Sequence, residues 1–239
     1  MIRKYLLPIF VMALFGFSSC RQESGSPVRN VRFDPNLLNQ MKDGSSCASH
    51  SYFYEDKEVN LGAVFTKQVL VSFTAGSTYE EQKNTMEKYG FVKGIGYPAT
   101  FSSGTLFNLS LIDGLSCSQT EQALKVLSKD QLVTYAAPYF VQQSNLLGVS
   151  NETIVAVQEG KKATLDDLLQ AYGASVVTSL GENVYVVEVD KSSKGNALEL
   201  ANYLKLQEGI AHAEPNFVVS DAPANPASSL RNLSGTTRR

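Results

Sequence analysis

Hydrophobic and polar positions along the chain repeat one arrangement of elements twice after residue 67. Runs rich in β-formers and helix-like segments alternate in the same order in both copies. The first copy predicts strands over 69–74, 91–101, 105–111 and 132–141, with helices over 78–90 and from 118 onward. The second copy predicts strands over 153–157, 174–178, 184–189 and 210–218, with helices over 164–173 and 195–206. Both copies therefore have the order β-α-β-β-α-β.

Local signals support this assignment. The segments Thr78–Glu81 and Ser118–Glu121 both match the capping box that opens a helix. Thr105–Leu111 alternates, with one set of side chains on each face of a strand. The closing run of the first copy, Ala136–Val141, shares its Pro, Phe and Val positions with Ala213–Val218 of the second copy.

The order β-α-β-β-α-β predicts a ferredoxin-like module, a four-stranded antiparallel sheet with both helices on one face. We therefore expect the α+β class, with two tandem ferredoxin-like modules over residues 68–143 and 151–221. Val184–Val189 is apolar on both faces of its predicted strand, so the open face of the second module should be covered. Either the other module or a partner protein could cover it.

The first twenty residues predict the compartment. Arg3 and Lys4 precede an apolar run, Tyr5–Phe17, that is too short to span a bilayer and is typical of a signal peptide. Its end, Ser18-Ser19-Cys20, resembles the lipobox of bacterial lipoproteins, which implies that Cys20 carries the lipid (a palmitate-type anchor). An ordinary secretory signal cut near Cys20 is the alternative. We expect a lipid-anchored, extracytoplasmic protein of the bacterial cell envelope, at the outer membrane.

The rest of the chain is predicted to be less regular. Residues 21–67 form a linker and an irregular lead-in, and residues 222–239 form a polar tail. The 21 Lys and Arg against 23 Asp and Glu leave no basic patch for nucleic acid. Two His and three Cys make a dedicated metal or haem site improbable, and we expect no cofactor. Cys47 and Cys117 remain as an even pair, either bonded or as two buried thiols.

One passage carries a family resemblance. Val184–Val189, the following helix and the segment Gly209–Val218 with its Ala-Glu-Pro-Asn sequence resemble the propeptides of subtilisin-like serine proteases, and most closely the fervidolysin-like prodomain. The resemblance covers the second copy and, more faintly, the first. It implies that the open sheet face docks on two surface helices of a protease. Glu214 and Asn216 match the residues that cap those helices, whereas the first copy has Ala137 and Tyr139 there.

The resemblance also implies that the chain after the last strand enters the protease cleft like a substrate. The residues concerned are Val218, Val219, Ser220, Asp221 and Ala222. Pro223 follows and would hinder cleavage, which predicts an inhibitor resistant to release, and a plain Pro/Ala linker is the alternative.

No catalytic-domain motif precedes the end at Arg239, and His50 and His212 are the only imidazoles. We therefore expect no enzyme, but an inhibitor or folding chaperone of a subtilisin-like protease, acting in trans. A non-inhibitory structural or protein-interaction lipoprotein is the alternative.

Overall fold

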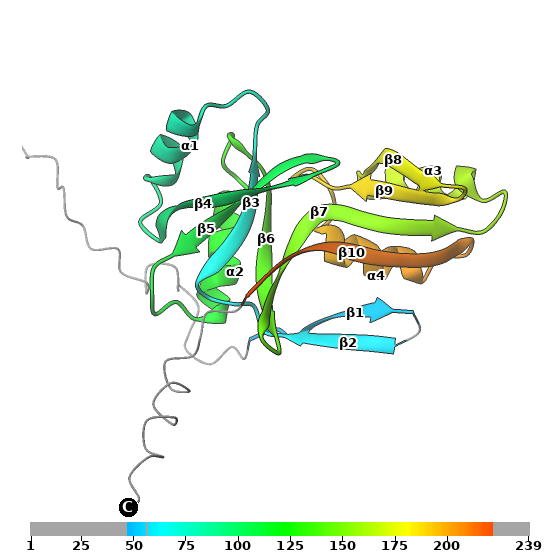
Figure 1. The fold of residues 1–239 in the computed structure, drawn as a ribbon, viewed down its shortest axis with the longest axis horizontal. Coiled ribbons are helices and arrows are strands. Elements are labelled where there is room, and N and C mark those ends of the chain that lie inside the picture. Colours follow the sequence, from blue (N-terminus) through cyan, green and yellow to red (C-terminus); the bar gives the residue numbers. More distant parts are fainter. Residues whose placement is uncertain (1–46, 56, 222–239) are drawn as a thin grey trace, which may run out of the picture. The chain divides into compact units, whose positions relative to one another are not determined.

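The computed structural model describes residues 47–55 and 57–221. The predicted signal peptide with Cys20, most of the predicted linker, Ala222 and the rest of the predicted tail lie outside the described residues. The described residues form ten strands and four helices (Figure 1), so the predicted α+β class is confirmed. The strands are β1 (His50–Tyr54), β2 (Lys57–Gly62), β3 (Gln68–Phe73), β4 (Val92–Phe101), β5 (Gly104–Leu111), β6 (Val133–Gln142), β7 (Asn145–Val157), β8 (Ser175–Gly181), β9 (Val184–Glu188) and β10 (Ile210–Asp221). The helices are α1 (Tyr79–Met86), α2 (Cys117–Leu127), α3 (Lys162–Tyr172) and α4 (Ala197–Lys205).

Eight of the strands form one antiparallel sheet. Strands of the first half pair in the order β4-β5-β3-β6, and those of the second half pair in the order β8-β9-β7-β10. The expectation of a separate four-stranded sheet in each half needs correction, because β6 and β7 form a hairpin that joins the two sets. Strand β7 makes this possible by its length, since its first residues pair with β6 and later ones with β9.

The close approach at this hairpin depends on a glycine. Gly148 of β7 lies opposite Tyr139 of β6, and a Cβ atom at Gly148 would overlap the Tyr139 ring. The tyrosine ring therefore packs directly on the backbone of the neighbouring strand, where only glycine leaves room.

Helix ends follow the capping chemistry of the sequence, with one shift. At the start of α1 the Thr78 hydroxyl accepts from the backbone N–H of Glu81, and the Glu81 carboxylate accepts in return, as predicted. The N-cap of helix α2 lies two residues earlier than predicted, because Ser116 and Gln119 form the capping box instead of Ser118 and Glu121. Two overlapping boxes occur in this segment, and the structure uses the first.

Two apolar cores lie on opposite faces of the first-half sheet. One face carries Val69 and Leu109, which pack with Met86 of α1 and Leu127 of α2. Leu106 points to the other face, as the alternation predicted, and is buried with residues of the second half. The open face of the first half is thus covered from within the chain.

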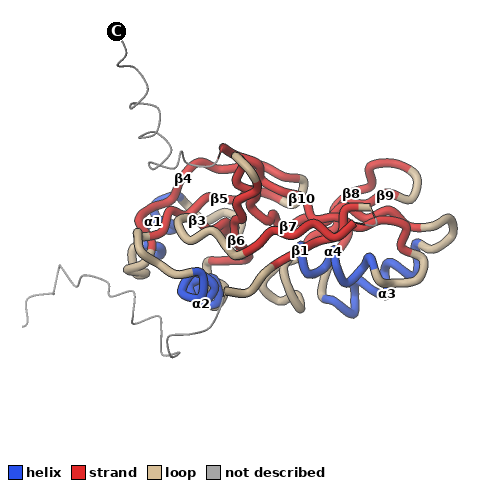
Figure 2. Tube along the Cα trace, turned by 90° about the horizontal axis from the view of Figure 1, so that it is seen from below, coloured by secondary structure: helices blue, strands red, loops and turns tan. Residues whose placement is uncertain are grey.

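The second half buries one sheet face against α3 and α4. Val155 and Val187 on adjacent strands pack with Leu165 of α3 and Leu204 of α4. Figure 2 shows both helices on the same side of β7 and β9. The opposite face of these strands carries no helix among the described residues.

Strands β1 and β2 form a hairpin inside the segment predicted to be irregular. The Asn202 side chain of α4 donates to the carbonyl of Ser51, and the rings of Tyr52 and Phe217 lie 5.4 Å apart. The turn has no glycine and instead holds Glu55 at a positive φ of 53°. Without a glycine signal, the hairpin is stabilised by its packing on α4 and β10 rather than by its turn.

Candidate protein-docking surface

One buried hydroxyl shows which side chains of β7 point to the face of the second-half sheet that carries no helix. Thr153 of β7 donates to the carbonyl of Ala197, which directs its side chain toward α4. Because side chains alternate along a strand, Glu152 and Ile154 point to the opposite, open face. Val186 of β9 lies directly beside Ile154. Val186 is only 3% exposed and Glu152 only 2%, so the partly buried Ile154 is the apolar side chain of this trio that a partner could reach.

Glu214 lies on the same open face, on the last strand. It stands opposite Ile154 in the β10–β7 pair, and its carboxylate lies 3.3 Å from Nε2 of His212. Both side chains are about one third exposed. The pKa of Tyr52 is raised, chiefly by burial and secondly by the charge of Glu214. Glu214 thus remains accessible to a donor from outside, although His212 is already close.

Asn216 is held within the chain. It lies in a register shift of β10 between Pro215 and Phe217, and its side-chain amide donates to Oε2 of Glu152 at 3.1 Å. Glu152 is only 2% exposed and also accepts from the backbone N–H of Ser103 at 2.6 Å. The carboxylate therefore links the last strand to the β4–β5 turn.

The segment after Asn216 continues as sheet. Val218, Val219 and Ser220 pair with residues 148, 147 and 146 of β7, and Asp221 pairs with Asn145. Val219 is 62% exposed. The residues that the resemblance assigns to a protease cleft thus form the end of β10 in this structure, and Ala222 lies outside the described residues.

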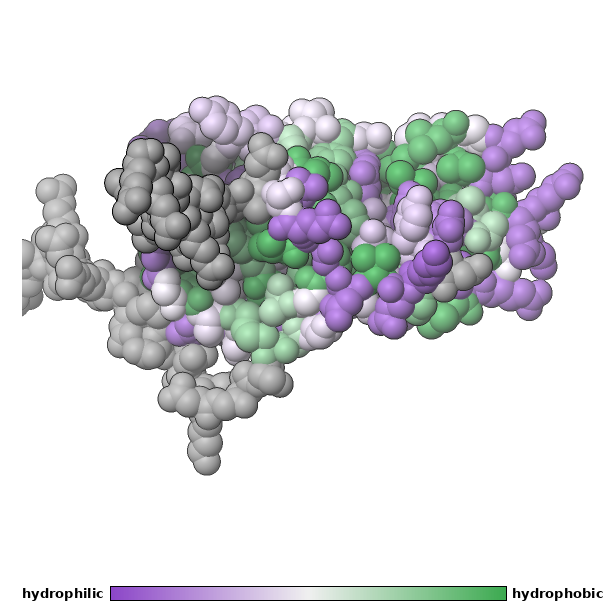
Figure 3. Space-filling model, turned by 60° about the horizontal axis from the view of Figure 1, so that its bottom comes forward, coloured by the Kyte–Doolittle hydropathy of each residue, from purple (hydrophilic) through white to green (hydrophobic). Residues whose placement is uncertain are grey.

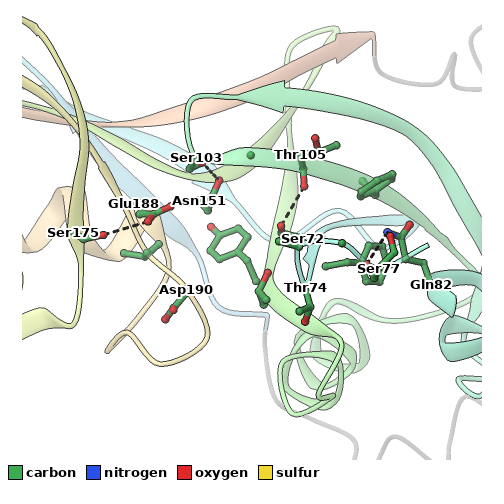
Figure 4. A pocket seen from close by; sticks show the side chains of 18 of the residues that line it. Ser72, Thr74, Ser77, Gln82, Ser103, Thr105, Asn151, Ser175, Glu188 and Asp190 are labelled. Atoms are coloured by element: carbon green, nitrogen blue, oxygen red, sulfur yellow. Dashed lines mark hydrogen bonds between the residues drawn. The ribbon is translucent and has the colours of Figure 1, made fainter. Parts of the chain in front are cut away.

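Glu152 and its neighbours form a site that the sequence did not predict. The Ser103 hydroxyl donates to the side-chain oxygen of Asn151, beside its backbone contact with Glu152. Ser103 and Asn151 line a cavity of about 670 Å³ (Figure 4), as do Ser175 and Glu188, and the Ser175 hydroxyl donates to the Glu188 carboxylate. The polar stretch Ser150–Thr153, which interrupts an apolar strand run, was the signal that could have drawn attention to Glu152.

The cysteine pair connects the segment before β1 to the start of α2. Cys47 and Cys117 are joined in a disulfide with Cα atoms 5.8 Å apart, within the usual range. Next to it, His50 Nε2 lies 3.5 Å from the Glu121 carboxylate and its ring packs on Phe140. Within residues 47–55 and 57–221, no group of three metal-ligating side chains could hold a metal ion.

Figure 3 brings the β1–β2 side of Figure 1 forward and shows apolar patches interrupted by polar side chains on the described surface there. None of the helices in the described part of the chain is long and apolar enough to cross a membrane.

Comparison with known proteins identifies one region. Residues 143–216 match the family model of the fervidolysin N-terminal prodomain, so this region is similar to a subtilase propeptide. Prodomains of this kind are usually non-catalytic. No curated protein matches the chain in sequence. A solved structure described as a Sxl-lethal protein/RNA complex matches with 14% identity over 66% of this chain and 100% of that chain. Its TM-score of 0.29 is too low to support any argument.

Proposed function

We propose that this protein is a subtilase propeptide-like protein that inhibits a subtilisin-like serine protease in trans, assists its folding, or does both. The observation that carries the proposal is the match of residues 143–216 to the fervidolysin prodomain family. In this proposal the protein is held at the bacterial cell envelope by a lipid on Cys20.

The open face of β8-β9-β7-β10 supports a docking role. The partly buried Ile154 on this face can pack on helices of a protease, and Glu214 lies directly beside it. A helix N-terminus presents unpaired N–H groups and the positive end of its dipole, which favour an oxygen acceptor. Glu214 supplies a carboxylate for this purpose, and the Asn216 side-chain oxygen can serve as a second acceptor.

We propose further that the two halves are tandem propeptide-like modules with different roles. The first-half residues at the positions of Glu214 and Asn216 are Ala137 and Tyr139, which are 0% and 2% exposed. They are buried against the second half and do not reach a partner. The first half therefore acts as a structural companion, and the second half provides the docking face.

An inhibition assay tests the proposal. Residues 21–239 are added to a panel of subtilisin-like proteases, including any encoded near this chain, and hydrolysis of a peptide substrate is followed. We expect inhibition of at least one protease, and at least about tenfold weaker inhibition by the double variant Glu214→Ala, Asn216→Ala. The matched control is Glu80→Ala, which removes an exposed carboxylate from α1 in the first half.

Two further measurements complete the assay. The unfolding midpoint of the double variant shows whether its fold is intact, because Asn216 also contacts Glu152. Recovery of activity by a denatured protease, with and without the protein, measures the folding role. Absence of both effects across the panel, or an unchanged double variant, contradicts the proposal.

A non-inhibitory interaction protein is the second candidate, and specific contacts favour it. The Asn216 amide is engaged by Glu152, Glu214 lies beside His212, and the segment from Val218 is paired with β7. A protein that binds a subtilase without slowing peptide hydrolysis would support this candidate. Binding is measured by calorimetry in the same panel.

A further inference from the structure

The cavity of about 670 Å³ lies between the two halves and includes neither Ile154 nor Glu214 of the proposed docking face. The first half contributes the β3–α1 loop and the β4–β5 turn, and the second half contributes residues 173–175 and 188–190. Cavities of this size commonly hold small ligands. Serine and threonine hydroxyls supply most of its polar lining, and none of the described residues that line it is lysine, arginine or histidine.

One buried amide in this cavity is only half used. Asn151 is 8% exposed, and its side-chain oxygen accepts from the Ser103 hydroxyl at 2.9 Å. Its amide nitrogen carries two N–H donors and bonds to none of the described residues. Among the described residues that are not exposed, the fully enclosed unpaired side-chain atoms are the Oδ1 atoms of Asn108 and Asn202, so the Asn151 nitrogen remains accessible from the cavity. A buried donor without a partner is costly, and a ligand oxygen would satisfy it.

Two carboxylates in the cavity lining are oriented by bonds within the protein. Oε1 of Glu188 accepts from the Ser175 hydroxyl at 3.2 Å. Oδ1 of Asp190 accepts from the backbone N–H and the hydroxyl of Ser192 at 2.7 and 2.6 Å. In both carboxylates the second oxygen has no hydrogen-bond partner among the described residues. The cavity thus offers two held acceptors and one held donor before any ligand arrives.

We propose that this cavity binds a neutral saccharide, whose hydroxyl groups donate to Glu188 and Asp190 and accept from the Asn151 amide. A hydroxyl group both donates and accepts, so a sugar satisfies both kinds of protein group. An ammonium group only donates and would leave the Asn151 amide unpaired. A phosphate or carboxylate group would be repelled by the two carboxylates. The partly exposed Phe107 supplies an apolar surface for the C–H groups of a sugar ring.

An NMR titration tests this inference without reference to the proposed protease function. Residues 21–239, labelled with ¹⁵N, are titrated with glucose, galactose, mannose, N-acetylglucosamine, maltose and cellobiose. At about 50 mM of probe, a site with a Kd of ~1 mM is almost full. We expect at least one saccharide to shift the side-chain amide signal of Asn151 to saturation. Glucose 6-phosphate and putrescine, which carry a phosphate and two ammonium groups, should bind at least roughly tenfold more weakly.

Two variants locate the binding to this cavity. Glu188→Ala removes one acceptor, and Asn151→Asp replaces the donor by an acceptor of the same shape that can keep the Ser103 contact. Each should raise the Kd of the best saccharide at least roughly tenfold. The matched control is Glu80→Ala, which removes an exposed carboxylate of α1 outside the cavity and should leave the Kd unchanged. Unfolding midpoints check each fold, and Glu188→Ala decides the test if Asn151→Asp does not fold.

Three results would overturn the proposal. The first is that none of the six saccharides binds at this concentration. The second is that a saccharide binds with a Kd that Glu188→Ala leaves unchanged. The third is that putrescine or glucose 6-phosphate binds as tightly as the best saccharide, because the cavity would then not select a neutral ligand.

Discussion

Replacement of Glu152 by alanine should reveal how much one buried carboxylate contributes to the joining of the two halves. Glu152 accepts from the Ser103 N–H at 2.6 Å and from the Asn216 amide at 3.1 Å, and it is 2% exposed. Glu152→Ala removes both acceptors and leaves two donors without their partner. The backbone N–H of Ser103 is the more costly of the two, because it cannot turn away.

The expected loss follows from these two contacts. Hydrogen bonds to a charged group contribute about 1.5–3 kcal/mol each. Part of this is offset, because burial of the carboxylate is itself costly and Glu188 lies opposite on β9. We therefore expect the free energy of unfolding to fall by about 2–4 kcal/mol, which for a protein of this size lowers Tm by roughly 5–12 °C.

Urea unfolding followed by circular dichroism measures this loss. Glu152→Gln keeps an acceptor for Ser103 and can pair with Asn216 after an amide flip, so its loss should be at most about 1.5 kcal/mol. Glu188→Ala, on the neighbouring strand, should change stability by less than about 1 kcal/mol. If Glu152→Ala costs less than Glu188→Ala, or if Glu152→Gln is as damaging as Glu152→Ala, the carboxylate does not have this role.

Two further predictions concern the first half. Reduction of the Cys47–Cys117 bond, or Cys47→Ser with Cys117→Ser, should lower the free energy of unfolding by up to about 4 kcal/mol, because the bond closes a loop with a separation of 70 residues; equal urea midpoints with and without reductant would contradict this. The Tyr89 hydroxyl donates to Asp130 at 2.6 Å, and burial followed by this hydrogen bond raises the pKa of Tyr89 to about 12. The contribution of this hydrogen bond to the free energy of unfolding is therefore complete below the ordinary tyrosine pKa of 10 and is lost as the pH rises through about 12. The stability difference between wild type and Tyr89→Phe should be constant up to pH 10 and shrink above it, and a difference that persists at pH 12 would refute the assignment.

Local signals in the sequence located most of the regular elements. The capping box at Thr78 and the alternation around Leu106 depend on neighbours a few residues away, so they could be interpreted without the fold. Gly173 likewise ends α3 in the left-handed conformation that glycine favours. The predicted N-cap of α2 was wrong because two capping boxes overlap, and the local sequence does not distinguish between them.

Non-local pairing could not be predicted in the same way. The β6–β7 hairpin depends on Tyr139 packing over Gly148, and its strand begins at Asn145, six residues before the predicted module. The engagement of Asn216 depends on Glu152, which is 64 residues away in sequence. No motif in the sequence around Tyr139 or Asn216 predicts these contacts. The docking face could be located by resemblance, but its internal hydrogen bonds could not.

The disulfide between Cys47 and Cys117 has a consequence for partly unfolded states of the protein. The bond ties the segment just before β1 to the first residue of α2. A state in which α4 and β10 have lost their structure therefore still keeps the β1–β2 hairpin near the first half. Ser51 and Tyr52 then stay close to where Asn202 and Phe217 must return. The last part of the chain can refold onto a hairpin whose freedom a covalent bond restricts.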